Sequence, residues 1–461
     1  MARPRSLAVP VPRIALALTL IWGSVAGAEP PPDTDRSSTS LMTLMPISTP
    51  ISDYTSDDWR SGACAFCFGA IGERRQKLYE HGVALDVSVT QTPQGVVSGG
   101  DNKAWKYSGN ADYYLALDSD RLGLWPGGLL KVTGRTKFGR GVLKRAGNLS
   151  PVNYGWLLPS IEDESESFLE EYYLTQGLTD WAALVFGRIL IGNLGDPNRL
   201  AGNEQTQFVN FSLRNSPLLN VITSSLSVHS ALLLLQPSHH VAIAPFALSR
   251  NDKDGVYGSR GGLFSEYSVG AQVMVNWEVA GLTGQFMPIG GWTNKQKFDA
   301  PFIILPILGL DIPEKSGNWV IGFSFNQYFY VPKHPNTGHV RATPFILQPE
   351  GIGAFLRFHY APEDRNLFNV FVSGGITGRG LIPTRPLDRY GVGFYALFQS
   401  DDFKNYPTLS NQIEDEWGME VFYNLAITPW LQFSPSVQYI DSGQVDVDHS
   451  VVVMARMQLY F

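Results

Sequence analysis

The sequence has little cysteine, little charge and no long apolar stretch. Only two cysteines occur in 461 residues, so a disulfide framework does not hold the fold together. No internal run approaches the roughly 18 apolar residues that a membrane-spanning helix needs. Charged residues make up 17% of the chain and aromatic residues 12%, and the formal net charge of −7 argues against general nucleic-acid binding. This composition suits the strands of a β-barrel better than helices.

The first residues have the pattern of an export signal. Arginines precede an apolar run at residues 14–25, and residues 26–28 read Ala-Gly-Ala, which is an A-x-A cleavage site. The apolar run is too short for a membrane anchor. We therefore expect residues 1–28 to be a signal peptide and the mature chain to begin at Glu29.

The segment 29–68 is rich in Pro, Ser, Thr and Asp without sustained periodicity, so we expect a flexible periplasmic segment. It contains Cys64 and Cys67. Their C-x-x-C spacing fits redox or metal chemistry, but no second cysteine pair completes a zinc site. In an oxidising compartment, a local disulfide between the two is the interpretation we favour. Residues 69–82 predict a short periplasmic helix that ends at Gly82.

Apolar and polar residues alternate along most of the remaining chain. In its closing part, Trp417, Met419 and Val421 alternate with Glu416 and Glu420. Period two puts each set on its own face of a strand. The runs extend over roughly 10 to 12 residues, whereas globular strands usually have about 5 or 6 and bilayer-spanning strands about 9 to 11. The sequence therefore predicts an all-β fold, a transmembrane antiparallel β-barrel of about 16 strands.

The predicted barrel occupies residues 83–461. The expected strands are residues 83–92, 107–118, 128–139, 167–177, 181–191, 223–236, 240–250, 264–279, 281–293, 317–330, 350–361, 366–378, 389–400, 415–427, 430–441 and 449–461. Short connections alternate with long ones over much of the chain, as periplasmic turns and external loops do in outer-membrane barrels. The Pro-rich connection 331–349 is long where a short turn is due, and a strand hidden there would shift the inside and outside assignment. The longest connections, residues 139–166 and 192–217, are candidates to fold into the lumen and narrow it.

Charged residues indicate which strand face meets water. Lys131, Arg135 and Lys137 share one face of the run 128–139. Near the bilayer midplane each would cost roughly 2 to 4 kcal/mol on the lipid side, so we expect them to face the lumen. The same argument gives further lumen residues, the cations Arg188, Arg357 and Arg456 and the carboxylates Glu171 and Glu420. Such charges either contact a permeating solute or only solvate a water-filled wall.

Several local patterns occur together between residues 70 and 461. They are Gly187-Arg188 followed by Phe208-Val209-Asn210, the connections Pro362-Glu363-Asp364-Arg365-Asn366 and Arg385-Pro386-Leu387-Asp388, and the closing residues Glu416, Glu420, Tyr423, Trp430, Pro435, Gln438-Tyr439-Ile440, Arg456 and Phe461. Together they resemble the OprB family of carbohydrate-selective porins. Cys64, Cys67 and the connection 331–349 are not features of that family.

The resemblance implies a sixteen-stranded channel in the bacterial outer membrane through which glucose and related sugars diffuse. The family lines its constriction with arginines and glutamate, which the resemblance carries over to Arg135, Arg188 and Glu171. It implies no catalytic residue, metal or cofactor. The implied partners are outer-membrane lipid and neutral sugars, with no nucleic acid, and the assembly is a monomer or a homotrimer.

Three alternatives stay open from the residues alone. Lys131, Arg135 and Lys137 by themselves also suit a general or anion-preferring diffusion porin without a sugar site. An outer-membrane enzyme would need a serine, a histidine and an orienting group in reach of one another, and no G-x-S-x-G nucleophile elbow accompanies the histidines. A secreted, soluble sugar-binding β protein shows the same alternation with its apolar face turned to a core.

Overall fold

The computed structural model describes most of the chain after residue 76. The described residues are 77–78, 80–156, 165–192, 196–223, 225–238, 240–250, 265–294, 317–331, 351–382, 384–404, 412–428 and 430–461. The chain divides into two compact units, Met1–Thr39 and Ser40–Phe461, and the second unit contains all of the described residues. The predicted signal peptide, the segment 29–68 with its Cys64–Cys67 disulfide, and most of the helix predicted at 69–82 lie outside the described residues.

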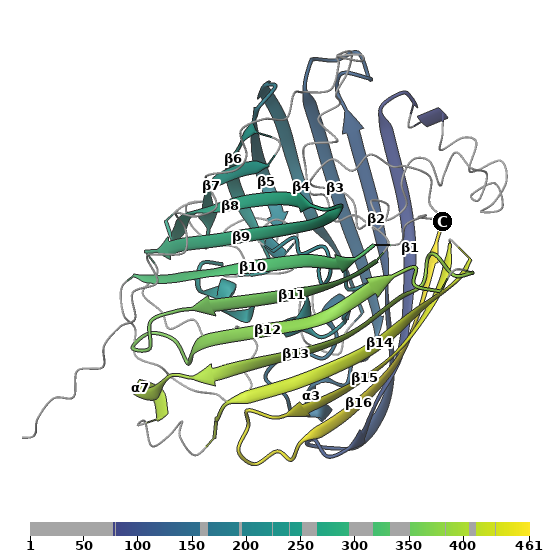
Figure 1. Ribbon diagram of the computed structural model, residues 1–461, viewed down its shortest axis with the longest axis vertical. Coiled ribbons are helices and arrows are strands. Elements are labelled where there is room, and N and C mark those ends of the chain that lie inside the picture. Colours follow the sequence, from purple (N-terminus) through teal and green to yellow (C-terminus); the bar gives the residue numbers. More distant parts are fainter. Residues whose placement is uncertain are drawn as a thin grey trace, which may run out of the picture. The chain divides into compact units, whose positions relative to one another are not determined.

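Within the described residues, sixteen antiparallel strands close into one barrel (Figure 1). The strands are β1 (Val83–Ser98), β2 (Ala104–Asp118), β3 (Gly128–Gly139), β4 (Glu166–Thr179), β5 (Ala182–Leu190), β6 (Ser227–Ser238), β7 (Val241–Ser249), β8 (Tyr267–Val279), β9 (Leu282–Thr293), β10 (Asn318–Tyr330), β11 (Gly351–Tyr360), β12 (Phe368–Arg379), β13 (Arg389–Gln399), β14 (Glu416–Thr428), β15 (Leu431–Asp441) and β16 (Ser450–Tyr460). Each strand pairs with its neighbours in sequence, and β1 pairs with β16, with Val89 opposite Leu459. The predicted antiparallel β-barrel is therefore confirmed.

The alternation in the sequence becomes an exposed outer face and a buried inner face. On β14, Val421 is 51% exposed, whereas Glu420 is fully buried. Large apolar side chains dominate the exposed positions of the strands, among them Leu130, Phe186, Val269, Ile321, Leu356, Val392, Met419 and Val437. An apolar outer band of this kind is what acyl chains require of a spanning barrel.

Tight turns join some of the strands. Ala280 and Gly281 connect β8 to β9 with φ angles of 53° and 76°, and positive φ at both central residues fits a two-residue hairpin turn. The Pro-rich connection after β10 does not interrupt the ladder, because β10 and β11 pair directly, with Phe323 opposite Phe358. The alternation of strand directions therefore continues through this region. Residues 332–350 of that connection lie outside the described residues.

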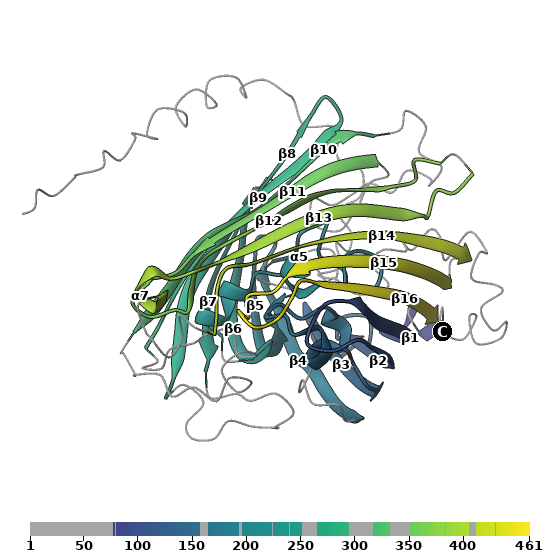
Figure 2. The same cartoon turned by 90° about the horizontal axis from the view of Figure 1, so that it is seen from below.

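Two long connections fold into the barrel. The first inward segment (residues 140–156) follows β3 and contains α3 (Leu143–Ala146) and η3 (Tyr154–Trp156). The second inward segment (residues 196–223) follows β5 and contains α5 (Phe211–Arg214) and η4 (Pro217–Val221). α5 lies within the ring of strands in Figure 2. The other elements contact the wall, α3 at β16, η3 at β2, and η4 at β10, β11 and β12. Another short helix, α7 (Asp401–Lys404), follows β13.

An apolar cluster holds the second inward segment against the wall of the barrel. The centroid of the Phe208 ring lies 4.9 Å from that of the Phe422 ring, with an interplanar angle of 78°. It lies 5.6 Å from the centroid of the Phe355 ring. Burial of such side chains stabilises the contact by about 1.5–3 kcal/mol each. Phe422 interrupts the polar inner face of β14, and its contact with Phe208 explains this exception.

No helix among the described residues has the length and apolar character to cross a membrane.

Candidate functional site

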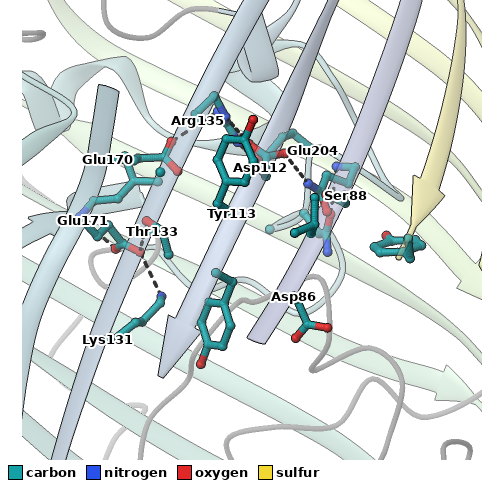
Figure 3. Close-up of a pocket in the computed structure, with 18 of the residues that line it drawn as sticks. Asp86, Ser88, Asp112, Tyr113, Lys131, Thr133, Arg135, Glu170, Glu171 and Glu204 are labelled. Atoms are coloured by element: carbon teal, nitrogen blue, oxygen red, sulfur yellow. Dashed lines mark hydrogen bonds and ion pairs between the residues drawn. The ribbon is translucent and has the colours of Figure 1, made fainter. Parts of the chain in front are cut away.

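Cations and carboxylates gather on the inner face of β2, β3 and β4 (Figure 3). Lys131, Arg135 and Lys137 of β3 are at most 4% exposed. Lys131 and Arg135 take part in ion pairs with carboxylates of the wall and of the second inward segment. We call the following residues the charged cluster: Asp112, Lys131, Arg135, Glu170, Glu171, Glu204 and Arg214.

Arg135 lies at the centre of the charged cluster. Its Nε is 2.5 Å from Asp112 Oδ1, its Nη1 is 3.2 Å from Glu170 Oε1, and its Nη2 is 3.6 Å from Glu204 Oε1. The Nη1 group also donates a hydrogen bond to the backbone oxygen of Gly155, at 3.4 Å. The guanidinium therefore contacts the strands and both inward segments, and charge-assisted hydrogen bonds of this kind are about twice as strong as neutral ones.

The strand register brings these groups together. Asp112 and Arg135 lie opposite each other in the ladder of β2 and β3. Between β3 and β4, Thr133 faces Glu171 while the next pair skips Glu170, which is therefore the extra residue of a β-bulge. As a result, both Glu170 and Glu171 are buried on the inner side. A strict period of two sends Glu170 outward, so sequence reasoning identified Glu171 alone.

Lys131 pairs with Glu171 inside the charged cluster. Its Nζ lies 2.9 Å from Glu171 Oε2, and it also lies 5.4 Å from the centre of the Tyr173 ring. The other oxygen of Glu171 accepts a hydrogen bond of 3.0 Å from the backbone nitrogen of Leu190. The ammonium and the carboxylate therefore neutralise each other in a fixed geometry.

The second inward segment contributes Glu204, which sequence reasoning could not place because it lies in a loop. Its Oε2 is 3.0 Å from Arg214 Nε. Burial would raise the pKa of Glu204, but the guanidinium groups of Arg214 and Arg135 outweigh it and hold the pKa below its ordinary value of 4.5. Next to it, Gln205 Nε2 donates a hydrogen bond of 3.0 Å to Asp112 Oδ2.

A cavity of about 70 Å³ lies beside the charged cluster and has room for several water molecules. Its charged lining consists of the carboxylates of Asp86, Asp112, Glu170, Glu171 and Glu204 and the cations of Lys131, Arg135 and Arg214. Donors and acceptors are therefore both present, with more carboxylates than cations. Among the described residues, no group of three or more His, Cys, Asp or Glu side chains could hold a metal ion.

Three other residues that the sequence assigned to the lumen contact the second inward segment. Arg357 Nε lies 2.5 Å from Asp196 Oδ2. Glu420 accepts hydrogen bonds from backbone nitrogens of the segment, and Arg456 donates to its backbone oxygens. None of the three lines the cavity. These contacts hold the segment in place, and a role in contacting solute stays a prediction for them.

Arg188 is not brought to the charged cluster. It lies opposite Tyr172 and His229 in the ladders on its two sides. It is 3% exposed, and its Nε donates a hydrogen bond of 3.2 Å to the Ser227 hydroxyl. It does not line the cavity, and a role in contacting solute stays a prediction for it.

Comparisons with known proteins agree with this architecture. The sequence model of the family described as "Carbohydrate-selective porin, OprB family" matches residues 102–461. Porin B of Pseudomonas aeruginosa is 27% identical over 128 residues, which cover 24% of this chain and 28% of that protein. The match thus spans little more than a quarter of the length of this curated relative.

Solved structures show the same fold. The high-pH structure of Pseudomonas putida OprB has a TM-score of 0.69 at 19% identity and covers 85% of this chain and 97% of that one. The low-pH structure of the same protein has a TM-score of 0.50 at 16% identity and covers 86% and 97% of the two chains. At these identities the likeness concerns the fold alone.

Proposed function

Because this chain belongs to the OprB family of carbohydrate-selective porins, we propose that its barrel lets neutral sugars diffuse passively across the bacterial outer membrane past the charged cluster. The family and the fold are those of an outer-membrane channel rather than an enzyme, and the proposal includes no catalytic step. The observation that carries it is the pairing of Lys131 and Arg135 with carboxylates beside a cavity.

Paired charges suit an uncharged solute. A sugar carries many hydroxyl groups that both donate and accept hydrogen bonds, a guanidinium offers a fork of donors, and a carboxylate accepts. Arg135, Asp112 and Glu170 supply all of these groups within one cluster. Transport also requires weak binding, because a solute that binds tightly does not leave. A few hydrogen bonds between the sugar and groups of the channel wall recognise the hydroxyl groups and still allow the sugar to leave.

The anion-preferring alternative receives less support. An anion channel needs a net positive field along its path. Around the cavity, five carboxylates face three cations, and Lys131 and Arg135 each lie within ion-pair distance of a carboxylate. The field of these cations is therefore largely cancelled where a solute would pass.

The test is single-channel conductance in planar bilayers, with and without glucose or maltose. Sugar should reduce the current through the wild-type channel. Arg135→Lys keeps the charge but loses the bidentate fork, so it should weaken sugar block by about tenfold, the equivalent of 1.4 kcal/mol.

The matched control is Arg121→Lys, because Arg121 lies outside the cavity lining and pairs with Asp118 at 3.5 Å. This variant should behave as the wild type. Conductance that does not change even at high sugar concentration would exclude a sugar site, and strong anion selectivity without sugar block would favour the alternative.

A further inference from the structure

Two carboxylates on β14 stand apart from the charged cluster. Glu416 and Glu420 are four residues apart on one strand, so both project to its inner face, and both are fully buried. Neither lines the cavity. A buried carboxylate needs hydrogen-bond donors to offset its lost hydration, and in both cases backbone N–H groups of the inward segments are among these donors.

Glu416 holds the first inward segment. Its Oε2 accepts a hydrogen bond of 2.6 Å from the backbone nitrogen of Leu149, and its Oε1 accepts one of 2.7 Å from that of Ser150. The Tyr395 hydroxyl, at 3.0 Å, and the Gly443 backbone nitrogen, at 3.2 Å, complete its surroundings. Both oxygens are thus bonded to a connection that is about 270 residues away in sequence.

Glu420 holds the second inward segment in the same way. The backbone nitrogen of Val209 lies 3.1 Å from Oε1 and 3.2 Å from Oε2, and that of Asn210 lies 2.9 Å from Oε2. Both nitrogens donate to the carboxylate. Each inward segment therefore has its own carboxylate on β14.

The two inward segments also bond to each other. The backbone nitrogen of Tyr154 donates to Val209 O at 2.8 Å, and that of Phe211 donates to Pro151 O at 2.9 Å. Gln438 of the wall links them as well, because it accepts from Asn210 Nδ2 at 3.0 Å and donates to the backbone oxygen of the first inward segment at 2.8 Å. These hydrogen bonds join the two inward segments into one body.

This body carries part of the charged cluster. The first inward segment provides the Gly155 oxygen, and the second provides Glu204, both of which contact Arg135. Glu204 precedes Val209 by only a few residues, so a displacement of the backbone bonded to Glu420 would also displace the carboxylate that faces Arg135.

We propose that Glu416 and Glu420 are positioning residues of the channel: acting from β14, they fix both inward segments and so set the width of the passage and the geometry around Arg135. They act through the backbone of the segments, to which both carboxylates are hydrogen-bonded. The part of this inference that concerns sugar rests on the proposed function, whereas the part that concerns width does not.

The experiment compares Glu416→Ala, Glu420→Ala and the double variant with the wild type, after heat-modifiable migration on a gel has shown that the barrels are folded. Conductance in salt alone reports the width, and sugar block reports the geometry around Arg135. Both carboxylate variants should raise the conductance and weaken sugar block by about tenfold or more. Glu420→Gln, which keeps one acceptor oxygen, should lie between the wild type and Glu420→Ala.

The matched control is Asn424→Ala on the same inner face of β14, because the Asn424 amide donates to the Ser434 hydroxyl of the neighbouring strand at 2.6 Å. This variant should keep wild-type conductance. If the alanine variants do not fold, Glu420→Gln and the corresponding Glu416→Gln decide. Folded Glu416 and Glu420 variants with wild-type conductance and sugar block overturn the proposal. A wild-type channel without sugar block whose variants still conduct more would refute the sugar function and leave the positioning role standing.

Discussion

Replacement of Arg357 by methionine would remove the cation that ties β11 to the second inward segment. Arg357 is fully buried, and its Nε lies 2.5 Å from Asp196 Oδ2. Its other nitrogens donate to the backbone oxygens of Leu213 at 2.7 Å, Ala201 at 2.9 Å and Arg214 at 3.2 Å. Methionine keeps an unbranched apolar side chain but carries no donor, so these oxygens lose their partner and the buried Asp196 carboxylate loses its counter-charge.

The magnitude follows from these contacts. Removal of one member of a buried ion pair costs about 3–5 kcal/mol, because the remaining charge stays buried without a partner. Burial of the apolar methionine side chain stabilises the folded state by roughly 1–3 kcal/mol. The lost hydrogen bonds to carbonyl groups contribute about the same amount, so these two effects cancel. Since 1.4 kcal/mol is a factor of ten, the second inward segment should leave the wall about 10² to 4 × 10³ times more often.

Limited proteolysis of the folded barrel in detergent measures this opening, because cleavage within residues 196–223 requires the segment to leave the wall. The strand ladder is untouched, so heat-modifiable migration should not change. Arg357→Met combined with Asp196→Asn should recover at least half of the protection, because the uncompensated charge is then absent. Cleavage of Arg357→Met at the wild-type rate would refute the reasoning, and so would a double variant that is cleaved faster than the single one.

Three further predictions concern the charged cluster and its packing. Lys131→Met should make the channel more cation-selective in a salt gradient, and the addition of Glu171→Gln should return the reversal potential toward the wild type; an unchanged potential in the single variant would show that Lys131 lies off the conduction path. The pKa of Glu204 in the folded protein lies below its ordinary value of 4.5. Its ion pairs with Arg214 and Arg135 therefore stabilise the site fully above pH 4.5 and are lost as the pH falls through the lowered pKa. The difference in sugar block between Glu204→Gln and the wild type should therefore be constant from neutral pH down to about 4.5 and disappear only below it, and a loss already at pH 6 would contradict the ion pairs. A Cβ atom at Gly393 would lie 2.9 Å from side chains of the second inward segment, whereas a Cβ atom at Gly290 would lie 3.6 Å from its nearest neighbour. Gly393→Ala should therefore destabilise the barrel by about 1–3 kcal/mol in thermal unfolding, and Gly290→Ala by much less. Equal effects of the two substitutions would refute the packing at Gly393.

The barrel could be predicted from the sequence because a spanning strand has one obligatory pattern. Lipid demands apolar side chains at every second residue, and Trp417, Met419 and Val421 follow that pattern without knowledge of any partner strand. The pairing of β10 with β11 across a long connection also preserved the strand directions, which the sequence alone had left open.

The site could be predicted only in part, because one of its carboxylates lies in a loop and another is the extra residue of a β-bulge. The cost of a charge in lipid places Lys131 and Arg135 on the lumen face of their strand. The alternation of residues along a strand cannot locate Glu204, which contacts Arg135 from the second inward segment. Arg357 and Glu420 look like lumen charges in the sequence, yet their contacts lie 161 and 211 residues away. Such contacts depend on how a connection folds back, and no local pattern encodes them.

Liposome swelling with solutes of equal size and different charge tests whether the channel favours uncharged sugars. A neutral hexose and the corresponding sugar acid differ by one carboxylate, and the paired charges around Arg135, with their excess of carboxylates, should pass the neutral solute faster. Swelling should be faster with the neutral hexose than with the sugar acid, and it should become slower as neutral sugars grow in length. Equal or faster swelling with the sugar acid would contradict it.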